Sequence, residues 1–115
     1  MTRAITREVY VKRILDRYRS LPGTLGHVRR TDRRLAEHLH QRGVPFEFVL
    51  ASFTVATCRR LFRPADAAPL PAVRTLHYYL PVLDELIREP PDPDDLRYLQ
   101  AKLVARSAPR LQDPP

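Results

Sequence analysis

A chain of 115 residues with one cysteine can build a single domain with a modest core, and it can form no internal disulfide. It lacks both the roughly 18 consecutive apolar residues of a membrane span and the apolar stretch of a signal peptide, and its single cysteine fits a reducing cytoplasm. We therefore expect a cytoplasmic protein that does not interact with membranes. Its net charge of +7 and isoelectric point of about 10.3 favour a polyanionic partner.

The positive charge belongs to the N-terminal half of the chain. Residues 1–63 hold 14 Lys and Arg against 5 Asp and Glu, a net of +9, whereas residues 64–115 hold 6 against 8, a net of −2. Any polyanion is therefore expected to bind the first half. Arginine makes up 18 of the 20 basic residues, a bias that a GC-rich gene would also produce.

Residues 5–21 have the apolar spacing of a helix that buries one stripe and exposes a basic back. The spacing is i, i+3, i+4 and i+7, and the stripe contains Tyr10, Val11, Ile14, Leu15, Tyr18 and Leu21. Lys12, Arg13, Arg17 and Arg19 fall on or beside the opposite side. Pro22 and Gly23 end this helix.

A short second helix is expected over residues 32–42, after a loop at 24–30. Thr31 or Asp32 is its expected N-cap, and Gly43 suits the position just past its end. Together with the Gly-Val-Pro turn and the helix that follows, this region has a helix-turn-helix-like outline. However, the following helix begins FEFVLASF, which belongs in a core, so we do not expect it to read the major groove.

Residues 46–62 are apolar almost all the way round a helix, which predicts a central position in the fold. A pair of strands is the alternative, because β-branched and aromatic residues are frequent here. The length of the segment and its lack of an internal turn favour one helix.

The second half of the chain is divided by prolines. A Pro-rich linker is expected at 64–71, and a fourth helix from about Ala72 is either kinked at Pro81 or split into two short helices that meet near Leu80. A fifth helix starts at Pro93 behind Asp92 as its N-cap. Its buried stripe is Leu96, Leu99 and Leu103.

These elements predict an all-α fold, a small bundle of about five helices. We expect one domain over residues 1–106, made of a basic half (1–63), the linker (64–71) and a mildly acidic half (72–106). Residues 107–115 are expected to form a disordered tail.

Catalytic and metal chemistry are not expected. Cys58 precedes two arginines and could pair with His77 as a nucleophile and base, but a small buried apolar residue is the stronger interpretation of Cys58. His38 and His40 lie two apart on a helix and point in different directions, so they cannot share a metal ion. The chain has three glycines and no phosphate-binding loop motif, so we expect no enzyme and no cofactor.

An aromatic run, His77-Tyr78-Tyr79, has two interpretations. Exposed tyrosines could stack on nucleic-acid bases. Alternatively, one ring is in the core and its neighbours are half exposed beside Pro81, and we favour this second interpretation.

Basic residues form the strongest candidate site. Arg59, Arg60 and Arg63 are explained by the negative end of the third helix. Arg33 and Arg34 are not explained this way, because they come at the positive end of the second helix, where a docked phosphate would offset the cost. The predicted nucleic-acid-binding residues are Lys12, Arg13, Arg17, Arg29, Arg30, Arg33 and Arg34.

The sequence therefore predicts a small basic helical protein that contacts DNA phosphates through its N-terminal half, and the charge does not separate DNA from RNA. The alternative is a helical protein-interaction module or an accessory subunit of a larger complex, with a protein partner bound through residues 72–106.

Overall fold

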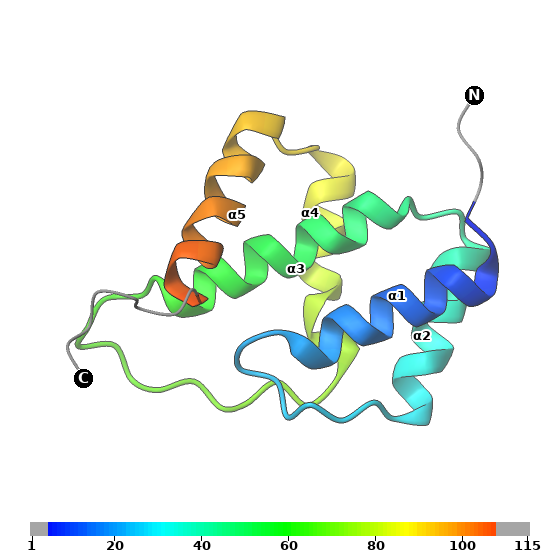
Figure 1. Ribbon diagram of the computed structural model, residues 1–115, viewed down its shortest axis with the longest axis horizontal. Helices are drawn as coiled ribbons and strands as arrows, with labels where there is room; N and C mark the ends of the chain where they lie inside the picture. Colours follow the sequence, from blue (N-terminus) through cyan, green and yellow to red (C-terminus); the bar gives the residue numbers. More distant parts are fainter. Residues whose placement is uncertain (1–4, 108–115) are drawn as a thin grey trace.

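The computed structural model describes residues 5–107, and within them it contains five α-helices, one short 3-10 helix and no strand. This confirms the predicted all-α fold with five helices. The helices lie around α3, which crosses the middle of the molecule (Figure 1). The elements are α1 (Arg7–Ser20), α2 (Arg30–Gln41), α3 (Phe46–Leu61), η1 (Leu76–Tyr79), α4 (Leu80–Arg88) and α5 (Pro93–Ser107).

α1 buries the stripe that its sequence spacing predicts. Tyr10, Val11, Ile14, Leu15 and Tyr18 are all buried, and α1 packs against α2 and α3. The helix starts two residues later than expected because the hydroxyl of Thr6 accepts the N–H of Val9, as an N-cap does. Lys12, Arg13 and Arg17 are left exposed on the back of this helix.

α2 starts two residues earlier than predicted, and its predicted N-cap is wrong. Arg29 occupies the N-cap position, and Asp32 is the third helical residue. The Asp32 carboxylate reaches back to accept the backbone N–H of Arg29 at 2.9 Å, which is one half of a capping box. Asp32 is completely buried, because it also binds a segment far along the chain, described below.

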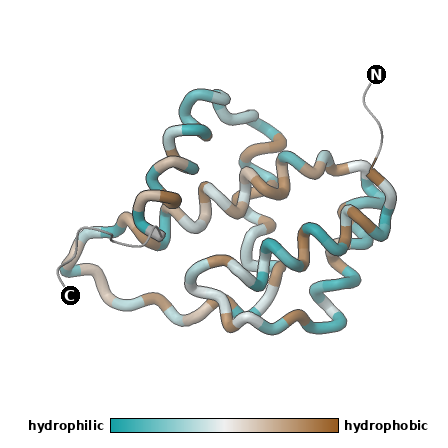
Figure 2. Tube along the Cα trace, in the orientation of Figure 1, coloured by the Kyte–Doolittle hydropathy of each residue, from teal (hydrophilic) through white to brown (hydrophobic). Residues whose placement is uncertain are grey.

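α3 has the central position that its apolar sequence predicts. It packs against α1, α4, α5 and η1, and hydrophobic residues recur along its trace (Figure 2). Phe53 is buried against Tyr79, with ring centroids 4.9 Å apart. At the start of α3, Val49 is buried, while Phe46, Phe48 and Leu50 are half-buried and pack against the core.

The segment that follows the Pro-rich linker is tied to the first loop. The N–H of Val73 donates to the carbonyl of Gly23 at 2.7 Å, and the N–H of Leu25 donates to the carbonyl of Val73 at 3.1 Å. Val73 to Thr75 are extended, so the predicted helix start at Ala72 is wrong.

The fourth predicted helix is split into two short helices, which is one of the two forms expected from the sequence. η1 ends at Tyr79 and α4 begins at Leu80, with Pro81 in its first turn, where a missing N–H costs no helical hydrogen bond. One hydrophobic core spans both halves of the chain, from Tyr10 in α1 to Leu83 in α4.

α5 begins as predicted and is the least embedded helix. The Asp92 side chain accepts the N–H of Asp94 at 2.8 Å, and α5 begins at Pro93. Its inner side chains Leu96, Leu99 and Leu103 are half-buried, and it packs against α3. Ser107 ends α5, and the remainder of the predicted tail lies outside the described residues.

Candidate nucleic-acid interface

A buried carboxylate fixes the start of α2 in space. Oδ1 of Asp32 accepts the N–H of Leu76 at 2.9 Å and the hydroxyl of Thr75 at 3.1 Å, while Oδ2 accepts the N–H of Arg29. A buried carboxylate needs such donors to offset its lost hydration. The bonds from Leu76 and Thr75 hold the beginning of α2 against the beginning of η1, and the bond from Arg29 is local to the start of α2.

The same carboxylate changes the argument for phosphate binding. Asp32 supplies a negative charge within the first turn of α2, which is where the helix dipole favours one. Because α2 begins at Arg30, Arg33 and Arg34 are its fourth and fifth residues and lie about one turn from the end. An external phosphate is therefore not needed to complement this helix end, and the predicted reason for these two arginines is wrong.

The arginines at the start of α2 nevertheless share one property. All of their side chains are exposed, and none has a hydrogen-bond acceptor or an ion-pair partner among residues 5–107. Such guanidinium groups remain available to an external anion. The four are Arg29, Arg30, Arg33 and Arg34.

A groove between α1 and α2 brings basic residues of both helices together. Lys12, Arg19 and Arg33 line a hollow of about 380 Å³. Asp16 lies among them, 2.8 Å from Lys12 Nζ and 3.1 Å from a guanidinium nitrogen of Arg19. The hydrogen bond from Lys12 lowers the pKa of Asp16, so this carboxylate stays charged and offsets one of the three cations.

Arg19 is a member of this surface that the sequence prediction omitted. It comes seven residues after Lys12, and seven residues are almost two full helical turns, so the two share one side of α1. The helical spacing therefore contained the signal. Arg33 lines this groove, whereas Arg34 lines a neighbouring hollow with Arg7 and Glu37. We use the name α1–α2 face for Lys12, Arg19 and Arg33 of the groove together with the neighbouring Arg29, Arg30 and Arg34.

Arg13 and Arg17 lie elsewhere. They line a separate hollow of about 570 Å³ between α1 and α3, which has Phe46 and Leu50 as its apolar lining. The structure thus does not bring the predicted residues of α1 into one group, because Lys12 faces α2 while Arg13 and Arg17 face α3. The difference follows from the 100° turn between successive helical residues.

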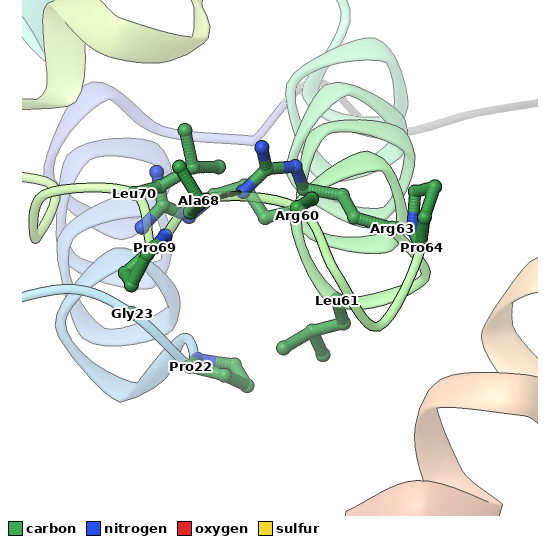
Figure 3. A pocket seen from close by; sticks show the side chains of 10 residues that line it. Pro22, Gly23, Arg60, Leu61, Arg63, Pro64, Ala68, Pro69 and Leu70 are labelled. Carbon is green, nitrogen blue, oxygen red and sulfur yellow. Dashed lines mark hydrogen bonds between the residues drawn. The ribbon is translucent and has the colours of Figure 1, made fainter.

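Arginines at the end of α3 have internal partners. Both terminal guanidinium nitrogens of Arg59, Nη1 and Nη2, donate to the Glu85 carboxylate, at 2.9 and 2.7 Å. Arg60 donates to the carbonyl of Pro71 at 2.8 Å, and Arg63 donates to the carbonyl of Ala68 at 2.8 Å. Figure 3 shows Arg60, from the last turn of α3, and Arg63, just after the helix, beside the Pro-rich linker. The two arginines bind carbonyl groups of the linker, and neither of them is among the predicted nucleic-acid-binding residues.

The aromatic run is divided between core and surface. Tyr79 is 2% exposed and packs edge-on against Phe53 and Tyr18, and burial raises the pKa of its hydroxyl. Tyr78 is 41% exposed, and the guanidinium of Arg60 lies over its ring at 5.4 Å. This arrangement confirms the favoured interpretation, in which one ring of the run lies in the core and its neighbour is partly exposed.

Cys58 is a buried packing residue. Its thiol donates to the carbonyl of Leu99 in α5 at 3.7 Å, and burial raises its pKa, which disfavours the reactive thiolate. The ring of His77 lies 3.0 Å from the hydroxyl of Thr75. His40 lies 3.4 Å from the carbonyl of Ile5, and three or more potential metal ligands gather nowhere in the part of the chain that the structure describes.

Comparisons with protein-family models, curated proteins and solved structures find no match to this chain. None of the described helices is both long and apolar enough to cross a membrane.

Proposed function

We propose that this protein binds DNA through phosphate contacts made by the α1–α2 face. One observation carries the proposal: the four arginines at the start of α2 are exposed and have no acceptor within residues 5–107. Arginine forks match phosphate oxygens in geometry as well as in charge. The arginines at the end of α3, by contrast, are used inside the fold.

The groove beside these arginines supports the same conclusion. Lys12, Arg19 and Arg33 converge on it from two helices, with Asp16 as the carboxylate among its lining residues. A backbone phosphate lying along the groove meets cations on both sides, while the buried Asp32 keeps the start of α2 rigid. Such contacts position a protein on nucleic acid and carry no sequence information, so we expect binding without strong base preference.

Salt dependence tests the proposal most directly. Binding of a fluorescein-labelled DNA duplex of arbitrary sequence is measured by anisotropy over a range of salt concentrations. With about four to six phosphates neutralised, log K falls with log salt with a slope of about −4 to −5. No binding at low salt overturns the proposal, and an RNA duplex in a parallel series separates the two nucleic acids.

A matched pair of variants tests the location of the site. R30E/R33E removes two cations from the α1–α2 face, and R42E/R88E makes the same change in net charge at exposed arginines outside it. We expect the first variant to lose most of the affinity and the second to lose little, with helicity checked by circular dichroism. An equal loss in both shows that net charge, and not this face, is responsible.

Exposed apolar side chains on α5 favour a second candidate function, in which residues 72–106 bind another protein. These side chains are Tyr98 and Val104.

A further inference from the structure

The hollow between α1 and α3 has cations on one wall and apolar side chains on the other. Arg13 and Arg17 line it from α1, and Phe46 and Leu50 line it from α3. The members of each pair are four residues apart, so each pair lies on one side of its helix, about one turn apart. The volume of about 570 Å³ is within the usual range of small-molecule sites. We call this site the α1–α3 hollow.

The two arginines of this hollow have no partner within residues 5–107. Both side chains are exposed, and neither donates a hydrogen bond or forms an ion pair there. Asp16, the carboxylate among the lining residues, is bound to Lys12 and Arg19 instead. Like charges four residues apart on a helix repel each other, so this pair carries a cost that a bound anion removes.

The opposite wall supplies a fixed apolar surface. Phe46 and Leu50 are half-buried and pack against the core, which holds both side chains in place. The ring of Phe46 also packs edge-on against Tyr10, with ring centroids 6.0 Å apart. An aromatic ring held beside a leucine is a surface on which a flat apolar group can stack.

The α1–α3 hollow adjoins the α1–α2 face. Asp16 lines both this hollow and the groove that contains Lys12 and Arg33. Arg13 follows Lys12 directly in the chain, so the two side chains are 100° apart around α1. Cations therefore continue across the exposed back of α1, and a nucleic acid on one side of this helix can reach the other side.

We propose that the α1–α3 hollow binds a single strand of DNA, with phosphates on Arg13 and Arg17 and a base against Phe46. A single strand offers both anions and unstacked flat bases, which match the two walls of the hollow. Bases inside a duplex are stacked and paired, so they are not free to enter. An acidic peptide offers the charges without the bases and is the weaker match. The site lies on a different surface from the one proposed for duplex phosphates and does not depend on it.

Two oligomers of equal charge test the role of the bases on the unaltered chain. Fluorescein-labelled oligo(dT) of about ten nucleotides is compared by anisotropy with an abasic oligomer of the same length. Both oligomers carry the same number of phosphates, so the bases are the difference between them. One stacked base makes oligo(dT) bind about fivefold to a hundredfold more tightly. Equal binding of the two oligomers overturns the proposal, and so does equally tight binding of a glutamate peptide of the same charge.

A matched pair of variants tests the arginines. R13E/R17E reverses both cations of the hollow, and R42E/R88E makes the same change in net charge at exposed arginines elsewhere. We expect R13E/R17E to weaken oligo(dT) binding by about tenfold more than R42E/R88E does. Equal losses in the two variants overturn the placement of the site.

F46L tests the stacking surface with little change to the fold. Leucine keeps a large apolar side chain against the core but removes the ring, and circular dichroism checks that the helices remain. We expect its affinity for oligo(dT) to fall toward that for the abasic oligomer, while its affinity for the abasic oligomer stays unchanged. If F46L binds oligo(dT) as tightly as the unaltered chain, no base stacks on Phe46 and the proposal is overturned.

Duplex binding keeps this inference separate from the proposed function. R30E/R33E is expected to weaken duplex binding more than oligo(dT) binding, and R13E/R17E is expected to do the reverse. The two proposals therefore fail in different measurements, the first with the duplex and the second with the single strand.

Discussion

Asp32 is the residue whose replacement tests the packing of the candidate site most sharply. Its carboxylate accepts three hydrogen bonds, from the N–H of Arg29, the N–H of Leu76 and the hydroxyl of Thr75, and the residue has no exposed surface. D32A removes all three acceptors and leaves the donors without partners, at about 1–3 kcal/mol for each that stays dry. Since water can reach the backbone N–H of Arg29, two donors lose their partner, and we expect a total loss of about 2–6 kcal/mol.

D32N separates the lost bonds from the lost volume. The amide keeps one oxygen that can serve Leu76 and Thr75, but its NH₂ group then faces the N–H of Arg29, two donors with no acceptor between them. The expected loss is about 1–3 kcal/mol. Urea unfolding followed by circular dichroism measures both variants. If D32N unfolds with the same free energy as the unaltered chain, the bond from the N–H of Arg29 to the Asp32 carboxylate does not stabilise the start of α2 in the way described.

Two further predictions concern a turn and a buried hydroxyl. Gly23 has φ +86°, and an added Cβ would lie 3.1 Å from Nε of Arg60, whereas Gly43 has φ +76° with nothing within 4 Å. G43A should therefore cost about 1 kcal/mol and G23A measurably more, and equal losses by urea unfolding would show that Arg60 moves aside freely. Burial, with a contribution from Glu47, raises the pKa of Tyr10 from 10.0 to about 12. The folded state therefore holds this proton more tightly than the unfolded state does. This difference adds up to about 2–3 kcal/mol to the free energy of unfolding below pH 10, and the added stability is lost as the pH rises toward 12. Y10F should flatten this part of the stability profile, and an unchanged slope would contradict the burial argument.

The elements that the sequence predicts best are those specified by neighbouring residues. In α5, Asp92 is the cap and Pro93 is the first helical residue, and both signals lie within two positions of the helix start. The stripe of α1 likewise depends on spacing alone. At the start of α2, Asp32 is a buried third helical residue and not the predicted N-cap, and two of its three bonds come from Thr75 and Leu76, 43 and 44 residues further along the chain.

The sequence predicts which basic residues of α1 are exposed, but it does not predict which of them lie together in the folded protein. An exposed helix back containing Lys12 and Arg13 follows from the apolar stripe of α1, and the 100° between them follows from helical geometry. Which neighbouring helix each residue faces depends on how α2 and α3 pack, and no local pattern encodes that arrangement. Only the packed structure shows that Lys12 lines one hollow with Arg33, while Arg13 lines another with Phe46.

The division of the chain by charge does not correspond to a division in the structure. The carbonyl of Gly23 bonds to Val73, and Asp32 bonds to Leu76, so residues after the linker hold both the loop before α2 and the start of α2 itself. A fragment ending at residue 63 would keep the positive charge but lose these bonds and four buried residues of the core, Val73, Leu76, Tyr79 and Leu83. Weak binding by such a fragment would therefore say nothing about the α1–α2 face. Charge reversal within the full chain is the experiment that separates the location of the cations from the integrity of the fold.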